Sequence, residues 1–366
     1  MTLDRYLLRQ IAGPALIALL ALLGLFAMVQ LVKVGEVSFA AGLTGADLLL
    51  LVGGSLPGFA VLAVPLAVLT GILLAFGRLA ADGELMALAA AGLPAHRLLP
   101  VPLGLGLLAA GLAFVLGAWV APATADALHA ASVRLAKRQV VAALEPGRFF
   151  EEIPRVLFYP QRAGEGPNRF EGFLLYDHRP GRTRHALLAR RAVIAPRAGS
   201  DRLELRLTDG EVHARDKRRD RYGVVRFERA TIGVDIERLI RDRTRFLRAV
   251  ERLGLGALRA AATAPDREPR ERLRLRAAFH RRFAFPGACV VFALLGTALG
   301  ASGRLRGRRR TLLAAAVVVV AYYLLVRVGD ALVDGAQLAP ALAAWMPNTL
   351  IGLPVVGWLV RRSRVP

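Results

Sequence analysis

Six apolar stretches divide the chain, and none of them contains a charged residue. They cover residues 11–32, 48–76, 98–125, 283–303, 311–326 and 341–360. A helix of about 20 apolar residues crosses the hydrocarbon core of a bilayer. The fifth stretch is short and can extend past Arg327 and Asp330. The pattern predicts an α-helical membrane protein with three transmembrane helices in residues 1–125 and three in residues 280–366.

Between the two groups of spans, residues 126–279 form a long polar insert. Residues 202–207 alternate polar and apolar side chains, and Asp209-Gly210 follows as a turn signal. Residues 222–236, 149–159 and 170–176 are further predicted strands. Residues 126–145, 237–262 and 266–282 read as helices that flank them. The insert is therefore predicted to be a β-rich domain of the sandwich, barrel or jellyroll type.

One short polar segment, Gly77–Gly92, lies between the second and third spans. It carries the charged residues Arg78, Asp82 and Glu84. Leu79, Leu85, Met86 and Leu88 have the spacing of one helix face. We expect a short helix along the membrane surface that offers an acidic and apolar ridge to a soluble partner. An ordinary polar loop explains the same pattern equally well.

The distribution of basic residues predicts the orientation. Loops on the side of the two termini hold twelve arginines, whereas the two short loops opposite hold Lys33 and Arg327. Because cytoplasmic loops are enriched in Lys and Arg, both termini are predicted to be cytoplasmic and the insert to lie outside the cytoplasm. No cleavable signal peptide is evident, since the first apolar stretch is long enough to span.

Composition narrows the class of partner. The formal net charge is +22, carried almost entirely by arginine, with Lys only at 33, 137 and 217. No nucleic-acid motif accompanies this charge, so an anionic membrane surface or lipid is the expected counterpart. The single cysteine, Cys289, allows no disulfide framework, and the six histidines form no metal-binding helix pattern.

No motif for catalysis is apparent. The three lysines lack the context of a phosphate-binding loop, and there is no Gly-x-Ser-x-Gly elbow. The charged residues near the membrane cluster at its outer face instead. Lys33, Arg134, Lys137 and Arg138 suit a cationic rim that binds an anionic amphiphile. The alternative is that they extend to the interface and only set helix ends; Arg327 and Asp330 are better read as a structural ion pair.

Several short motifs, in order along the chain, resemble the LptF/LptG permeases of the lipopolysaccharide exporter. They are Leu3-Asp4-Arg5-Tyr6-Leu7, Gln30-Leu31-Val32-Lys33, Gly77–Gly92 around Glu84, Trp119-Val120-Ala121-Pro122, His280-Arg281-Arg282 before Phe285-Pro286, and Trp345-Met346-Pro347-Asn348. The Gln-Leu-Val-Lys run favours LptF, whereas Asp4 and the Trp-Val-Ala-Pro stretch resemble LptG. Gly83 and His280 depart from the usual residues.

The resemblance implies a heterodimer of two related permeases in the bacterial inner membrane. Two copies of an LptB-like cytoplasmic ATPase would dock on the surface helices, through Arg78, Asp82, Glu84, Leu85 and Met86. ATP would be bound by that partner, so no cofactor or metal is expected in this chain. Lipopolysaccharide would enter from the outer leaflet past a rim that includes Lys33, Arg134 and Lys137. It would leave along a periplasmic β-jellyroll bridge formed with LptC-like and LptA-like partners.

Two other classes of function stay open from the residues alone. A non-transporting assembly or scaffold protein would use the β domain to bind a periplasmic partner and would have no ATPase. A lipid-modifying membrane enzyme is disfavoured because no nucleophile–base pair is apparent, although His178, His185 and His213 lie in the insert.

Overall fold

The structure is a computed structural model that describes residues 2–38, 44–142, 144–153, 156–166, 168–177, 184–196, 202–216, 221–235, 249–302 and 307–363. The chain forms two compact units. A helical unit comprises Met1–Val32, Val52–Asp126 and Arg248–Pro366, and a second unit comprises Lys33–Leu51 and Ala127–Leu247. Residues 248–279, which the sequence pattern groups with the β-rich insert, belong to the helical unit.

Six helices are long and apolar enough to cross a membrane within the described chain, as predicted. They are α1 (Thr2–Ser38), α2 (Gly45–Ala81), the continuous series α4 (Pro100–Val115), η2 (Leu116–Val120) and α5 (Ala121–Ala142), then α9 (Pro269–Ala301), α10 (Arg308–Asp334) and α11 (Pro340–Ser363). The fifth span continues past Arg327 and Asp330, as its short apolar stretch suggested. Shorter helices are α3 (Glu84–Ala90), η1 (Ala95–Leu98), α7 (Ala249–Arg252) and α8 (Leu255–Thr263).

Helices α2 and α9 form the centre of the helical unit. About 61% of the most apolar window of α2 and 56% of that of α9 is buried, against 6% for α1. Glycines let these two helices approach closely: a Cβ on Gly300 would lie 2.4 Å from Phe76 Cβ, and one on Gly296 would lie 2.9 Å from Ile72 Cγ2. In membranes, small residues at helix contacts replace the hydrophobic driving force with close van der Waals packing.

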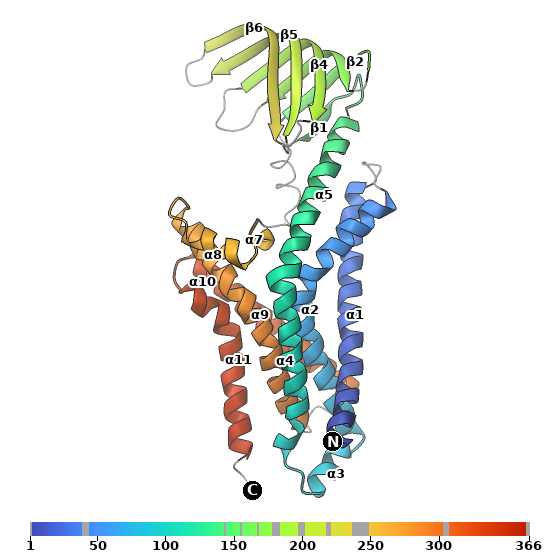
Figure 1. Ribbon diagram of the computed structural model, residues 1–366, viewed down its shortest axis with the longest axis vertical. Coiled ribbons are helices and arrows are strands. Elements are labelled where there is room, and N and C mark those ends of the chain that lie inside the picture. The colour runs from blue at the N-terminus through green and yellow to red at the C-terminus, as the bar shows by residue number, and fades with distance from the viewer. Residues whose placement is uncertain are drawn as a thin grey trace. The chain divides into compact units, whose positions relative to one another are not determined.

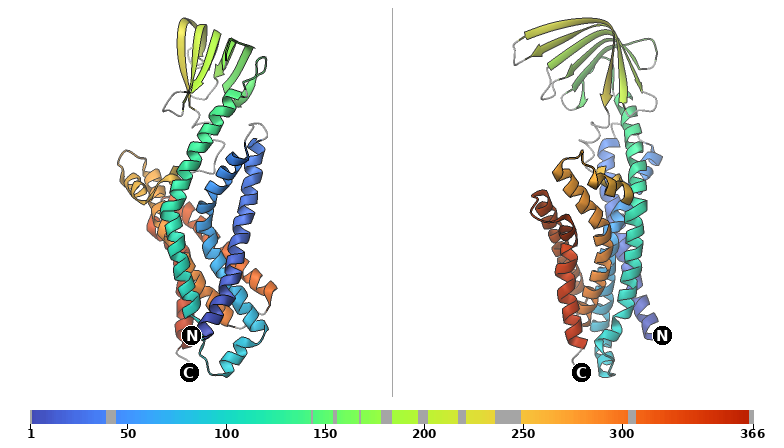
Figure 2. Two further views of the ribbon diagram at one scale, coloured as in Figure 1. Left: turned by 45° about the vertical axis from the view of Figure 1, so that its right-hand side comes forward. Right: turned by 60° about the vertical axis from the view of Figure 1, so that its left-hand side comes forward.

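The inserted β domain is one six-stranded antiparallel sheet in which each strand pairs with the next. Its strands are β1 (Phe150–Ile153), β2 (Val156–Ala163), β3 (Arg169–Asp177), β4 (Arg184–Pro196), β5 (Arg202–Asp216) and β6 (Arg221–Asp235). Figure 2 shows the six strands curving as one layer. One face carries an apolar core that includes Phe158, Phe173, Leu187 and Leu205. This confirms the predicted inserted, jellyroll-like β domain; strand β4 was missed by the sequence pattern.

The predicted turn at Asp209-Gly210 is wrong, because β5 runs through it. Its pairs Thr208↔Arg229 and Gly210↔Phe227 keep one register, and β4 pairs along its other side. Asp209 instead has a φ of 53°, and Gly210 has no room for a Cβ, which would lie 2.4 Å from Leu188 O. The positive φ resets the alternation: Leu205 and Leu207 face the core before it, and Val212 after it. The broken pattern thus marks a bend within a continuous strand.

Candidate functional site

Five helix ends meet at one end of the helical unit, where α1 begins and α2 ends. Their apolar side chains form one cluster, built from Leu7 and Ile11 of α1, Phe76 and Leu79 of α2, Leu98 of η1 and Ala293 of α9, with Leu85 and Leu88 of α3 packed against it. Figures 1 and 2 show α3 at this end, together with the start of α1 and the end of α11. The cluster therefore fixes α3 as a surface element on a packed base.

Helix α3 is shorter than predicted, because α2 continues to Ala81 and Gly83 separates the two helices. Gly83 has a φ of 77°, a left-handed conformation that glycine adopts without strain. Gly92, with a φ of 76°, follows α3. The predicted helix over residues 77–92 is thus a corner: Arg78 belongs to α2, Asp82 to the turn, and Glu84 begins α3.

Two polar contacts tie the flanks of α3 to the first turns of α1. The Tyr6 hydroxyl donates to the Glu84 carboxylate, with O–O distances of 2.7 and 3.0 Å. Arg97, on η1, donates two hydrogen bonds to Asp4 at 2.9 and 3.1 Å. Paired N–H donors on a carboxylate fix orientation as well as distance. Sequence reasoning missed both contacts, although Asp4 and Tyr6 lie in a motif that it singled out.

The predicted face of Leu79, Leu85, Met86 and Leu88 is divided by the structure. Leu79 is buried, and Leu85 and Leu88 pack inward, whereas the Met86 side chain is 63% exposed. Arg78 and Asp82 are also exposed and form an i, i+4 ion pair at 3.8 Å. The outward surface is therefore Met86 and small alanines beside a ring of charge. Such a surface suits docking of another protein, since it offers a protruding flexible apolar side chain with a charged rim.

The predicted rim residues lie in the second unit. Lys33 is an exposed residue near the end of α1. Arg134 and Lys137 lie in the helical backbone of α5, and their side chains fall outside the described part of the structure. Both segments belong to the same compact unit. The cationic rim stays a prediction.

Around the end of the fifth span, arginines of α9 pair with aspartates of α10. Asp330 pairs with Arg327, as the sequence suggested, at 3.8 Å, and also with Arg281. Arg274 donates to Asp334 at 2.7 Å. The two contacts from α9 were not predicted, because 49 to 60 residues separate the partners. These pairs hold the fourth and fifth spans together outside the apolar stretch.

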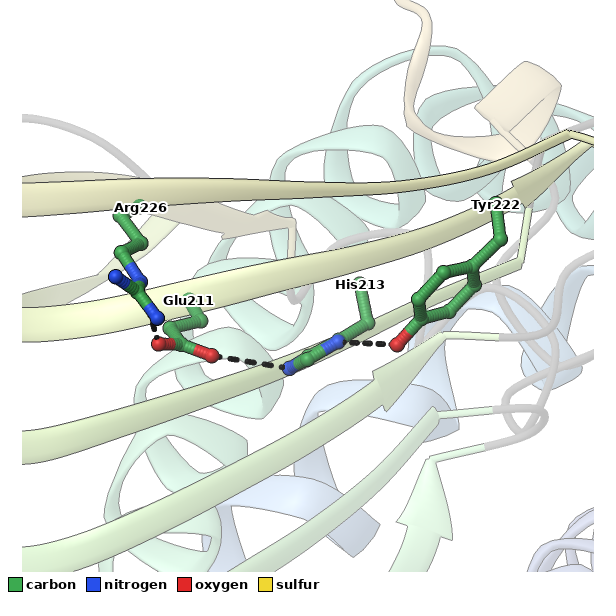
Figure 3. Close-up of polar contacts among 4 residues, drawn as sticks. All are labelled: Glu211, His213, Tyr222 and Arg226. Atoms are coloured by element: carbon green, nitrogen blue, oxygen red, sulfur yellow. Dashed lines mark hydrogen bonds and ion pairs between the residues drawn. The ribbon is translucent and has the colours of Figure 1, made fainter.

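His213 belongs to a row of polar side chains across β5 and β6 (Figure 3). Its Nδ1 lies 2.6 Å from the Tyr222 hydroxyl, and its Nε2 lies 3.5 Å from Glu211. Arg226 donates to the other oxygen of Glu211 at 2.9 Å. Glu211 and Arg226 are direct partners in the strand register, so the row is a cross-strand ladder on an open surface. His178 lies outside the described residues, as does the side chain of His185. Among the described residues no group of three metal ligands is present.

The helical unit and the inserted sheet define the class of the protein: an integral membrane protein with six spans and a β domain inserted between the third and fourth. The model of the family described as "Lipopolysaccharide export system permease LptF/LptG" matches residues 5–362. The chain belongs to this family of transport permeases. A search of curated proteins found no match.

Proposed function

We propose that this chain is one permease subunit of an ABC transporter that extracts lipopolysaccharide from the outer leaflet of the bacterial inner membrane. It acts beside a second LptF/LptG-type permease and passes the lipid to a periplasmic β-jellyroll bridge of LptC-like and LptA-like partners. Two copies of an LptB-like ATPase bind ATP and dock on the cytoplasmic side, so the chain needs no cofactor of its own. Membership of the lipopolysaccharide export permease family supports this proposal.

The observation that carries the coupling step is the mounting of α3. A helix that receives force from a soluble partner must move as one body with the membrane helices behind it. Leu85 and Leu88 anchor α3 on the cluster of helix ends, and Glu84 is bonded to Tyr6 of the first span. Displacing α3 therefore displaces the ends of α1 and α2. Met86 and Asp82 stay outward for the partner.

The sheet supports the proposed bridge in a similar way. Strand β6 is 15 residues long and pairs only with β5 among the described strands, so its other edge is a template for a further strand. Tyr222 and Val225 on β6 are about two-thirds exposed. A scaffold function would also use this edge, and only the absence of an ATPase partner would favour it.

Charge reversal at Glu84 tests the proposal. In Glu84→Lys the acceptor of Tyr6 is lost and the sign of the docking surface changes, so lipid-stimulated ATP hydrolysis and lipid release should both fall while membrane insertion is unchanged. Glu171→Lys, an exposed carboxylate of β3, is a control with the same change in charge. Full coupled activity of Glu84→Lys would refute the docking assignment.

A further inference from the structure

A break in the third span exposes one backbone carbonyl to an arginine of the fourth span. Residues Leu116–Val120 form a π-helical turn, in which the Ala121 N–H bonds to Leu116 O. In a regular α-helix that N–H would bond to Gly117 O. The next residue, Pro122, has no N–H to offer. Gly117 O is thus left without a backbone donor, although Gly117 is buried.

Arg282 of α9 supplies the missing donor. Its Nη1 donates to Gly117 O, and its Nη2 donates to Glu251 O at 3.2 Å and to Leu253 O at 3.3 Å. Glu251 and Leu253 lie at the end of α7, where the described chain resumes after β6. One guanidinium therefore joins the third span, the fourth span and the segment that returns from the β domain. Arginine suits this role because its planar fork holds several donors in fixed directions.

The surroundings of Arg282 favour a joint rather than a rigid core contact. Four residues later, Pro286 interrupts α9 and leaves the Arg282 carbonyl without its helical donor. Beyond it, Asn348 of α11 donates to Ala284 O at 2.7 Å and accepts from Tyr322 of α10 at 3.2 Å. Polar contacts from three other spans thus converge on one proline-interrupted stretch of α9, residues 282–286.

Aromatic packing keeps the π-helical turn and α9 together at the same place. Phe283, next to Arg282, lies 5.5 Å from Phe114, and Phe114 lies 5.5 Å from Trp119 within the turn, measured between ring centroids. Phe279 packs on Phe283 at 5.4 Å. π-Helical turns are often found where a helix changes shape in function. A shift of the third or fourth span would therefore reach Arg282 and, through it, Glu251 and Leu253.

We propose that Arg282 is a positioning residue for transport: it couples rearrangement of the spans, at the π-helical turn and the Pro286 interruption, to the segment 249–253 that connects with the β domain. This inference rests on the proposed function for the source of the motion. It adds a path from the membrane helices to the β domain that does not pass through lipid contacts.

The test compares Arg282→Gln and Arg282→Lys with Arg276→Gln, an exposed arginine of α9 whose loss changes charge equally. Hydrogen–deuterium exchange is measured for the chain alone and for the purified transporter with and without ATP plus vanadate. In the chain alone, Arg282→Gln should raise exchange in residues 249–253 and 116–120 by roughly tenfold, as expected for loss of charged hydrogen bonds. Arg276→Gln should match the unaltered protein.

In the transporter, trapped nucleotide should change exchange both at α3 and in residues 249–253. Arg282→Gln should abolish the change in 249–253 and keep the change at α3. Arg282→Lys, which keeps the charge but not the fork, should reduce it and serves as the deciding variant if Arg282→Gln does not assemble. An unaltered response of 249–253 in the variants, or none in the original protein, would overturn the inference. Failure to purify any ATPase would instead overturn the proposed function and leave the result on the isolated chain standing.

Discussion

Gly83 turns the chain between α2 and α3, and replacing it with alanine perturbs that corner alone. An added Cβ meets no atom within 4 Å, so the substitution causes no steric overlap. Its effect comes from the backbone, since Gly83 has a φ of 77°. The left-handed conformation costs a residue with a Cβ roughly 1–2 kcal/mol. That cost acts directly on the geometry in which α3 is held.

The expected consequence is weaker docking of the ATPase. If the corner must keep its left-handed turn to present Met86 and Asp82, a cost of 1–2 kcal/mol lowers the docking-competent population by roughly five- to thirtyfold. The apparent Kd for the purified ATPase, measured by titration of the permease in nanodiscs, should rise by a similar factor. Membrane insertion and the yield of the folded chain should change little, because Leu85 and Leu88 keep their packing.

Two companion variants separate the backbone effect from other causes. Gly83→Asn should keep most of the affinity, because Asn tolerates the left-handed region better than alanine. Gly111→Ala, in α4, adds the same methyl group at a site with no atom within 4 Å and without a positive φ, and should be silent. Equal affinities for Gly83→Ala and the unaltered chain would refute the idea that this corner sets the docking geometry.

Three further predictions concern the rim, the core and the orientation. Lys33→Glu should weaken photo-crosslinking of lipopolysaccharide while Lys33→Arg preserves it, and unchanged crosslinking would make Lys33 a residue that only marks the helix end. Gly300→Ala should lower the thermal stability in detergent by about 1–3 kcal/mol, because its Cβ would lie 2.4 Å from Phe76 Cβ; Gly357→Ala, with open space around it, is the control. Reporter fusions should place residues 150–230 outside the cytoplasm and both termini inside, and a cytoplasmic signal from 150–230 would contradict the proposed topology.

The spans and the inserted β domain could be predicted from sequence because both depend on local patterns. Hydrocarbon requires about 20 apolar residues in one helix, and a half-buried strand requires alternation. Helix ends were less predictable: α1 and α9 extend well past their apolar stretches into polar residues that continue the same backbone hydrogen bonding. Strand β4 was missed because its two runs of alternation, at Leu187–Ala189 and Ala192–Ile194, are out of phase across the bend.

The features that define the sites were not accessible to local patterns. Tyr6 and Glu84 are 78 residues apart in sequence, and Arg282 and Gly117 are 165 apart. No spacing rule relates such pairs, so only the packed helices bring them together. Gly83 and Pro122 carried a signal, since glycine permits a left-handed turn and proline removes a donor. The signal shows where a helix is interrupted and leaves open whether it ends, as at Gly83, or continues through a π-helical turn, as before Pro122.

Site-specific photo-crosslinking at Met86 tests most directly whether α3 docks an ATPase. A photoreactive residue at 86, in cells that make the complete transporter, should give a covalent adduct with a soluble subunit that hydrolyses ATP. The same residue at Leu255, the first residue of α8, should give no such adduct, because the proposed topology places it on the other side of the membrane. An absent adduct at 86, or equal adducts at both positions, would contradict the account.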